Sequence, residues 1–171
     1  MQRFIIACLT LIASPHLFAI EPIRVHWPLT EYVSLVKTEA KDLMVKNGTQ
    51  VGLSFPTLIL FSKTGELAWI GKPVELTPEI VEATNNSGAP AETDALSKVL
   101  SVLDNARKVY QVVGFEQVSG APSAHVSRNK ATAILVVGNF SCEGCVSMIE
   151  TSMQAIPNSW NQMAATVTLS Q

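Results

Sequence analysis

Two cysteines near the C-terminus, Cys142 and Cys145, have the residue type and spacing best suited to chemistry. In a helix they would lie one turn apart, close enough to form a disulfide or to share a metal ion. The apolar, partly β-branched run 133–137 precedes them and an amphipathic pattern follows, which predicts a strand, a turn, Cys-x-x-Cys and a helix. Cys142 would then lie at a helix N-terminus, where unpaired N–H groups and the helix dipole favour the reactive thiolate.

This cysteine pair suits three kinds of chemistry: thiol–disulfide exchange, binding of a soft metal ion, and a structural disulfide or inert thiols. Covalent attachment of a c-type haem is excluded, because Val146 stands where that motif needs a histidine. A structural zinc site within one chain is not expected, because His26 and His125 are isolated and there is no second cysteine pair. We favour exchange and predict neither a bound metal ion nor a cofactor.

The N-terminus has the pattern of a secretory signal peptide. A short basic start at 1–3 precedes an almost wholly apolar run at 4–13, and Ala19 offers a small residue before the expected cleavage. That run is shorter than the roughly 20 residues that cross a bilayer. The alternative is an uncleaved anchor. Cleavage after 1–19 would remove Cys8, so we predict a periplasmic or secreted protein with one cysteine pair and no membrane span in the mature chain.

The composition limits the class of protein. A chain of 171 residues that is 47% hydrophobic and 15% charged suits one globular domain, or two small ones. Its formal net charge of -2 gives no electrostatic reason to expect nucleic acid or an anionic membrane as a partner. The oligomeric state stays open.

Helix and strand patterns alternate along the chain, which indicates an α/β fold. Apolar spacings of three and four predict helices over 32–46 and 94–109, and Thr77-Pro78 resembles a helix start. Within 32–46 the expected apolar face comprises Val33, Val36, Ala40, Leu43 and Met44. The remaining predicted elements are a short strand at 23–29, a buried strand over 53–61, a hairpin turn at 62–65, a return strand at 66–70, a loop or weak hairpin at 114–130, and a final strand at 164–169.

Two segments resemble parts of the thioredoxin fold. Residues 51–71, VGLSFPTLILFSKTGELAWIG, carry a loop, a proline, a threonine, a buried strand, a glycine turn and a return strand in the order typical of that family. Residues 131–156, ATAILVVGNFSCEGCVSMIETSMQAI, resemble the central strand that leads into the active-site helix. The stretch 126–145 also resembles exported thioredoxin-like reductases linked to cytochrome maturation.

The resemblance implies roles for residues in both segments. Cys142 and Cys145 would form the redox pair, and Pro56 would be the family's cis-proline. Phe55 would present its backbone to a substrate peptide beside the cysteines, and Thr57 would complete the substrate-contacting loop. The implied activity is that of a thiol–disulfide oxidoreductase whose partners are protein thiols and disulfides.

The two segments stand in the reverse of the family's order, because the proline half precedes the cysteine half. Three explanations follow: a permuted single domain, a degenerate domain followed by a truncated one, or part of a longer ancestral protein. We expect the first, since neither half alone would bury its sheet. Residues 20–110 and 111–171 would then share one thioredoxin-like sheet flanked by helices.

Three positions differ from the family's pattern. Ser141 replaces the usual tryptophan, Glu143 and Gly144 lie between the cysteines without the common proline, and no acid occurs near Val136 at the end of the central strand. The carboxylate of Glu143 opposes thiolate formation at Cys142. Proton transfer would need a group other than the missing acid.

The same cysteines resemble, more weakly, those of heavy-metal-associated domains. Residues 139–169 carry the Cys-x-x-Cys, the helix, the Ile156-Pro157 end and the strand of that family, which implies binding of Cu(I) by two thiolates. Against this, the preceding strand is continuously apolar, as in a core covered on two sides, rather than alternating. A soft-metal carrier and a redox-inactive interaction protein with a thioredoxin-like scaffold are the alternatives to exchange.

Overall fold

The computed structural model describes residues 23–46, 48, 54–87, 94–109, 121–138 and 143–168. The predicted signal peptide at 1–19 lies outside these residues. None of the helices within the described ranges is long and apolar enough to cross a bilayer.

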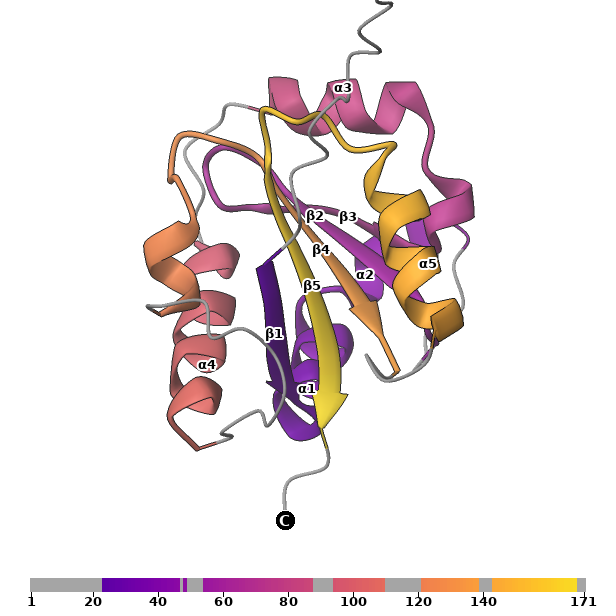
Figure 1. Cartoon of the computed structure of the whole chain (residues 1–171). Coiled ribbons are helices and arrows are strands. Elements are labelled where there is room, and N and C mark those ends of the chain that lie inside the picture. Colours follow the sequence, from indigo (N-terminus) through magenta and orange to yellow (C-terminus); the bar gives the residue numbers. More distant parts are fainter. Residues whose placement is uncertain are drawn as a thin grey trace, which may run out of the picture.

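The described residues form five strands and five α-helices, with two short 3₁₀ turns (Figure 1). In chain order they are β1 (Ile23–Pro28), α1 (Leu29–Thr38), α2 (Lys41–Lys46), β2 (Thr57–Phe61), β3 (Leu67–Gly71), η1 (Pro73–Glu75), α3 (Pro78–Asn86), α4 (Ala95–Val109), η2 (Pro122–His125), β4 (Thr132–Val137), α5 (Glu143–Met153) and β5 (Asn161–Thr168).

The five strands make one mixed sheet in the order β1-β5-β4-β2-β3. β5 pairs in parallel with both β1 and β4, whereas β2 runs antiparallel to both β4 and β3. The predicted α/β class is confirmed. Strands from both halves of the chain contribute to this sheet, and the two late strands β5 and β4 lie between the early strands β1 and β2.

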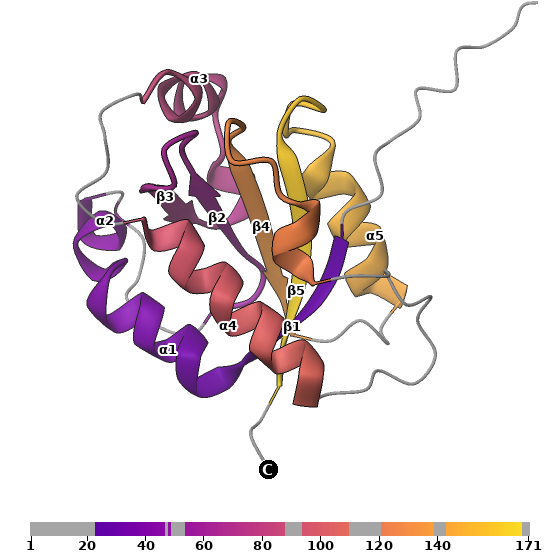
Figure 2. The same cartoon turned by 90° about the vertical axis from the view of Figure 1, so that its left-hand side faces the viewer.

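Helices cover both faces of the sheet (Figures 1 and 2). One buried cluster packs α1, α2 and α4 against one face, and the other packs α5 against the opposite face, with α3 beside it. All six residues of β4 are buried, and Ile134 and Val136 belong to the first cluster while Leu135 and Val137 belong to the second. This explains why its sequence is continuously apolar: a central strand covered on both faces has no solvent side.

The predicted helix over 32–46 is two helices. The backbone N–H groups of Glu39 and Ala40 both donate to the carbonyl of Leu35 at 3.0 Å, which ends α1, and α2 begins at Lys41. The kink keeps Ala40 and Met44 in the core, as the pattern predicted. The face of α1 was partly misplaced, because its buried residues are Tyr32, Leu35 and Val36, whereas Val33 is half-buried.

Two strand boundaries also differ from prediction. The strand expected over 53–61 begins at Thr57. The last strand begins at Asn161 rather than at 164, because its first two residues are polar yet buried and hydrogen-bonded. In the stretch 114–130, the described part holds the short turn η2.

Candidate functional site

The predicted cysteine motif lies at the junction of β4 and α5. Helix α5 begins at Glu143, so Cys145 is its third residue. Cys142, which lies outside the described residues, immediately precedes the helix in sequence. The backbone therefore has the predicted order of a buried strand, a connection and a helix that starts at the cysteine motif.

The strand register relates this junction to the predicted substrate loop. β2 is antiparallel to β4, and Thr57 at the start of β2 pairs with Val136 near the end of β4. The loop that contains Phe55 and Pro56 therefore lies at the same end of the sheet at which β4 leads toward α5. A closer approach of this loop to the thiols stays a prediction, since it depends on Cys142.

The three predicted loop residues differ in exposure. The side chain of Phe55 is 42% exposed, Pro56 is half-buried and Thr57 is buried. The peptide bond between Phe55 and Pro56 is cis, as the resemblance implies for this proline. The Thr57 hydroxyl donates to the carbonyl of Ser54 at 2.5 Å, which closes the loop on itself. Phe55 is therefore the loop side chain that a partner molecule can reach most fully.

Three aromatic rings connect this loop to the core. Phe55 stacks on Tyr32 with ring centroids 5.9 Å apart and planes at 27°. Tyr32 in turn makes an edge contact with Trp27, with centroids 5.4 Å apart and planes at 71°. Burial raises the pKa of Tyr32, and the side chain of Thr57 acts in the opposite direction.

Sequence reasoning assigned no role to Tyr32. A signal for it was present, because Tyr32, Leu35 and Val36 follow the i, i+3, i+4 spacing of a buried helix face. The contact with Phe55 could not be read from that spacing, since the two residues lie on separate elements.

The end of β4 is held from the other side by β5. Thr166 is buried and pairs with Val137, and its hydroxyl donates to the carbonyl of Gly138 at 3.2 Å. Gly138 is the last described residue before the cysteine motif. This bond fixes the point at which the chain leaves the sheet toward α5.

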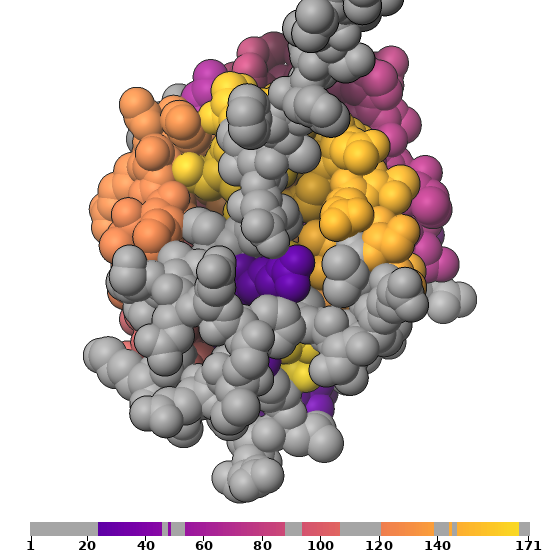
Figure 3. Space-filling model, in the orientation of Figure 1, coloured from indigo at the N-terminus to yellow at the C-terminus, as the bar shows by residue number. Residues whose placement is uncertain are grey.

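Helix α5 packs one face on the sheet and leaves the other at the surface. Ile149 and Met153 are buried in the second cluster, together with Trp160. Figure 3 shows the outer side of the helix reaching the molecular surface, and its exposed described residues include Gly144, Ser147, Met148, Glu150 and Thr151. The first turn of α5, which holds Cys145, therefore lies on a helix that solvent reaches.

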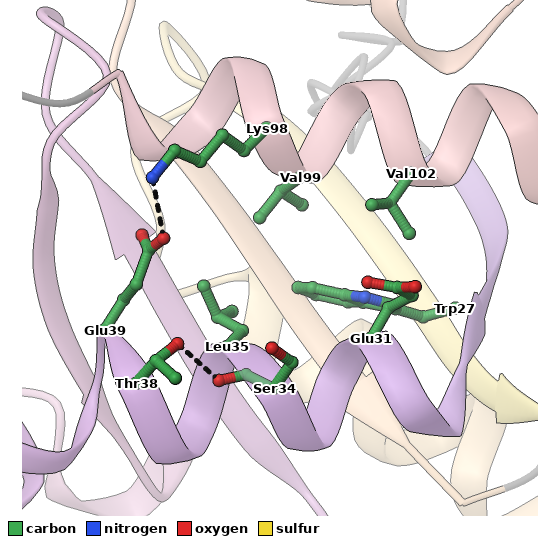
Figure 4. Close-up of a pocket in the computed structure, with 9 residues that line it drawn as sticks. All are labelled: Trp27, Glu31, Ser34, Leu35, Thr38, Glu39, Lys98, Val99 and Val102. Atoms are coloured by element: carbon green, nitrogen blue, oxygen red, sulfur yellow. Dashed lines mark hydrogen bonds and ion pairs between the residues drawn. The ribbon is translucent and has the colours of Figure 1, made fainter.

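A separate hollow of about 170 Å³ lies between α1 and α4 (Figure 4). The ring of Trp27 lies between the two helices, beside Val99 and Val102. Lys98 Nζ and Glu39 Oε1 form an ion pair of 2.9 Å across the two helices. None of the predicted site residues lines this hollow, but Trp27 contacts Tyr32 and so connects its wall to the aromatic series.

The described residues hold no group of three or more His, Cys, Asp or Glu side chains that could bind a metal ion. Comparison of the chain with protein-family models, with curated proteins and with solved structures gave no match. The strand register and the aromatic contacts around the proline loop are therefore the observations from which a function can be inferred.

Proposed function

We propose that this chain is an exported thioredoxin-like thiol–disulfide oxidoreductase that exchanges with protein partners through Cys142 and Cys145. One observation carries the proposal: the pairing of Thr57 with Val136. It puts the entry of β2, through Phe55 and Pro56, at the end of the central strand that leads to the cysteine motif. The family resemblance requires these two segments to meet, although they are far apart in sequence.

The strand order supports a single permuted domain as the form of the fold. β4 occupies the central place among the five strands, as the resemblance implies for the strand before the active-site helix. Two independent domains would each keep their own strands together. Here β5 and β4, from the second half of the chain, separate β1 from β2, which both belong to the first half. The proline half and the cysteine half complete one sheet.

The proposed reduction of a substrate proceeds through two exchanges. The Cys142 thiolate attacks one sulfur of a substrate disulfide, so a mixed disulfide forms and the other substrate sulfur leaves as a thiolate. The Cys145 thiolate then attacks the Cys142 sulfur, which closes the internal disulfide and releases the second substrate thiolate. Two electrons pass from the dithiol to the substrate. Oxidation of a substrate dithiol is the same sequence in reverse.

Two local features act on the attacking thiol in opposite directions. Helix α5 has 11 residues and begins directly after Cys142, so its dipole and free N–H groups favour the thiolate. The carboxylate of Glu143 disfavours it. The balance between them, with the reduction potential of the pair, sets whether the protein reduces, oxidises or isomerises.

Reduction of insulin tests the proposal on the chain from residue 20 onward. We expect the wild-type protein to catalyse reduction by dithiothreitol and Cys142→Ser to fall to the uncatalysed rate, because the attacking sulfur is gone. Cys145→Ser should instead accumulate a mixed disulfide that mass spectrometry detects, since nothing resolves it. Ser141→Ala is the matched control and should stay active.

Unchanged activity in Cys142→Ser would contradict the proposal. Titration of the reduced protein with Cu(I) in the presence of a competing chelator distinguishes thiol–disulfide exchange from the main alternative, soft-metal binding. One equivalent bound together with no exchange activity would identify a soft-metal carrier instead.

A further inference from the structure

The side chain of Tyr32 contacts the predicted substrate loop at Phe55. The two rings stack with their centroids 5.9 Å apart and their planes at 27°. Tyr32 belongs to α1, whereas Phe55 directly precedes Pro56 at the entry of β2. One buried side chain therefore supports the residue before the proline.

Tyr32 is itself fixed in place. It is 1% exposed, lies in the first buried cluster and meets the ring of Trp27 edge-on. Phe55, by contrast, is 42% exposed. A partly exposed aromatic ring rotates among several rotamers unless a neighbour supports it. The stack on Tyr32 supports one face of Phe55 and leaves the opposite face to solvent.

We propose that Tyr32 is a positioning residue for substrate binding: it holds Phe55 in the arrangement in which this loop receives the peptide around a substrate disulfide. This inference rests on the proposed exchange activity.

The inference also indicates the class of substrate. A loop that offers a supported aromatic face and a backbone edge gains affinity from a polypeptide chain that lies along it. A small disulfide that reaches only the sulfur atom gains nothing from the loop. Tyr32 should therefore affect exchange with protein disulfides and leave exchange with small disulfides unchanged.

The test compares Tyr32→Leu and Tyr32→Phe with the wild-type protein on two substrates, insulin and 5,5′-dithiobis(2-nitrobenzoic acid). Leucine removes the stack, whereas phenylalanine keeps the ring and is the matched control. We expect KM for insulin to rise about fivefold in Tyr32→Leu and to stay near the wild-type value in Tyr32→Phe, with kcat unchanged in both. The rate with the small disulfide and the reduction potential of the cysteine pair should equal those of the wild type.

Leu103→Ala is the control for loosening of the core, because Leu103 belongs to the same buried cluster but lies on α4. An unchanged KM in Tyr32→Leu, an equal rise in Leu103→Ala, or an equal loss with the small disulfide would each overturn the inference. An inert wild-type protein would instead refute the proposed function.

Phe55→Ala decides the matter if Tyr32→Leu does not fold, because it removes the other ring of the stack at a position that is 42% exposed. We expect KM for insulin to rise about fivefold and the rate with the small disulfide to equal that of the wild type. An unchanged KM for insulin would overturn the inference.

Discussion

At the scale of single residues, Asn161 shows how a polar side chain can begin a buried strand. It is 8% exposed. Its Oδ1 accepts from the backbone N–H of Ser127 at 3.0 Å, and its Nδ2 donates to the Ser127 carbonyl at 2.9 Å and to Thr132 Oγ1 at 3.0 Å. One amide thus ties the turn before β4 to the start of β5.

Asn161→Ala should lower the free energy of unfolding by about 2 kcal/mol, because it removes the partner of the buried Thr132 hydroxyl and two bonds to the backbone of Ser127. Urea denaturation measures the difference. Asn158→Ala, at an exposed position of the preceding turn, is the matched control and should change the stability by less than about 0.5 kcal/mol. Equal losses in the two variants would show that the Asn161 amide is not what stabilises this corner.

The cysteines and the proline are the parts of the candidate site that local sequence patterns predicted. Cys-x-x-Cys before an amphipathic helix is a local pattern, and Pro56 before a buried strand is another. Tyr32 has no such local mark, because its proposed role depends on a contact between residues of separate elements. Its burial was predictable from helical spacing, but its partner Phe55 was not.

At the scale of elements, the hairpin turn between β2 and β3 is joined to the start of α4. Gly65 has φ of +85°, and its carbonyl accepts from the N–H of Leu96 at 2.9 Å. Asp94 accepts from the N–H of Ser97 at 2.9 Å and so caps the helix. A Cβ on Gly65 would overlap the Asp94 carboxylate. Glycine is therefore needed both for the turn and for the cap beside it.

Gly65→Ala should lower the free energy of unfolding by about 2–3 kcal/mol, from backbone strain at positive φ together with loss of the helix cap. Gly48→Ala is the matched control, because Gly48 has φ of +70° but nothing within 4 Å of an added Cβ. Strain alone should cost it about 1 kcal/mol. Chemical denaturation measures the stability of both variants. Equal losses of stability would show that the overlap with Asp94 and its helix cap does not contribute.

The elements themselves were predictable where burial and hydrophobicity agree. β4 is apolar at nearly every position and buried at every position, so its pattern correctly predicted a buried strand. β5 begins with Asn161 and Gln162, two polar residues whose side chains hydrogen-bond carbonyls outside the strand. Their polarity is typical of a loop, so the sequence did not predict the start of this strand. The break between α1 and α2 occurs within a continuous helical pattern, so periodicity did not indicate it, and Ala40 at the break is fully buried in the first cluster.

At the scale of the whole molecule, the two halves of the chain interleave in one sheet. β1 is separated from β2 by β5 and β4, although β1 and β2 are consecutive strands. The sequence predicted that the halves would share a sheet, on the argument that neither could bury its own. The order of the strands could not be predicted from the sequence, because the hydrophobic pattern of a strand does not indicate which strands it pairs with.

Neither half should fold when it is made alone. Residues 20–110 would hold β1 apart from β2 and β3 by the width of two missing strands. Residues 111–171 would expose the face of β4 and β5 that α1, α2 and α4 cover. We expect each fragment to lack near-ultraviolet circular dichroism and the mixture to regain it. A fragment that gives a cooperative unfolding transition on its own would contradict a shared sheet.

The pairing of Ile23 with Met163 has a further consequence, for the rate at which the protein reaches its native state. The first strand cannot be paired until the last one is available, and contacts between such distant positions slow the search. The interval before they meet leaves the inner edge of β1 and the apolar residues of the first half uncovered. During that interval we expect the incompletely folded chain to bind chaperones that recognise exposed apolar segments. Its aggregation in vitro should increase with the time that β5 needs to pair with β1.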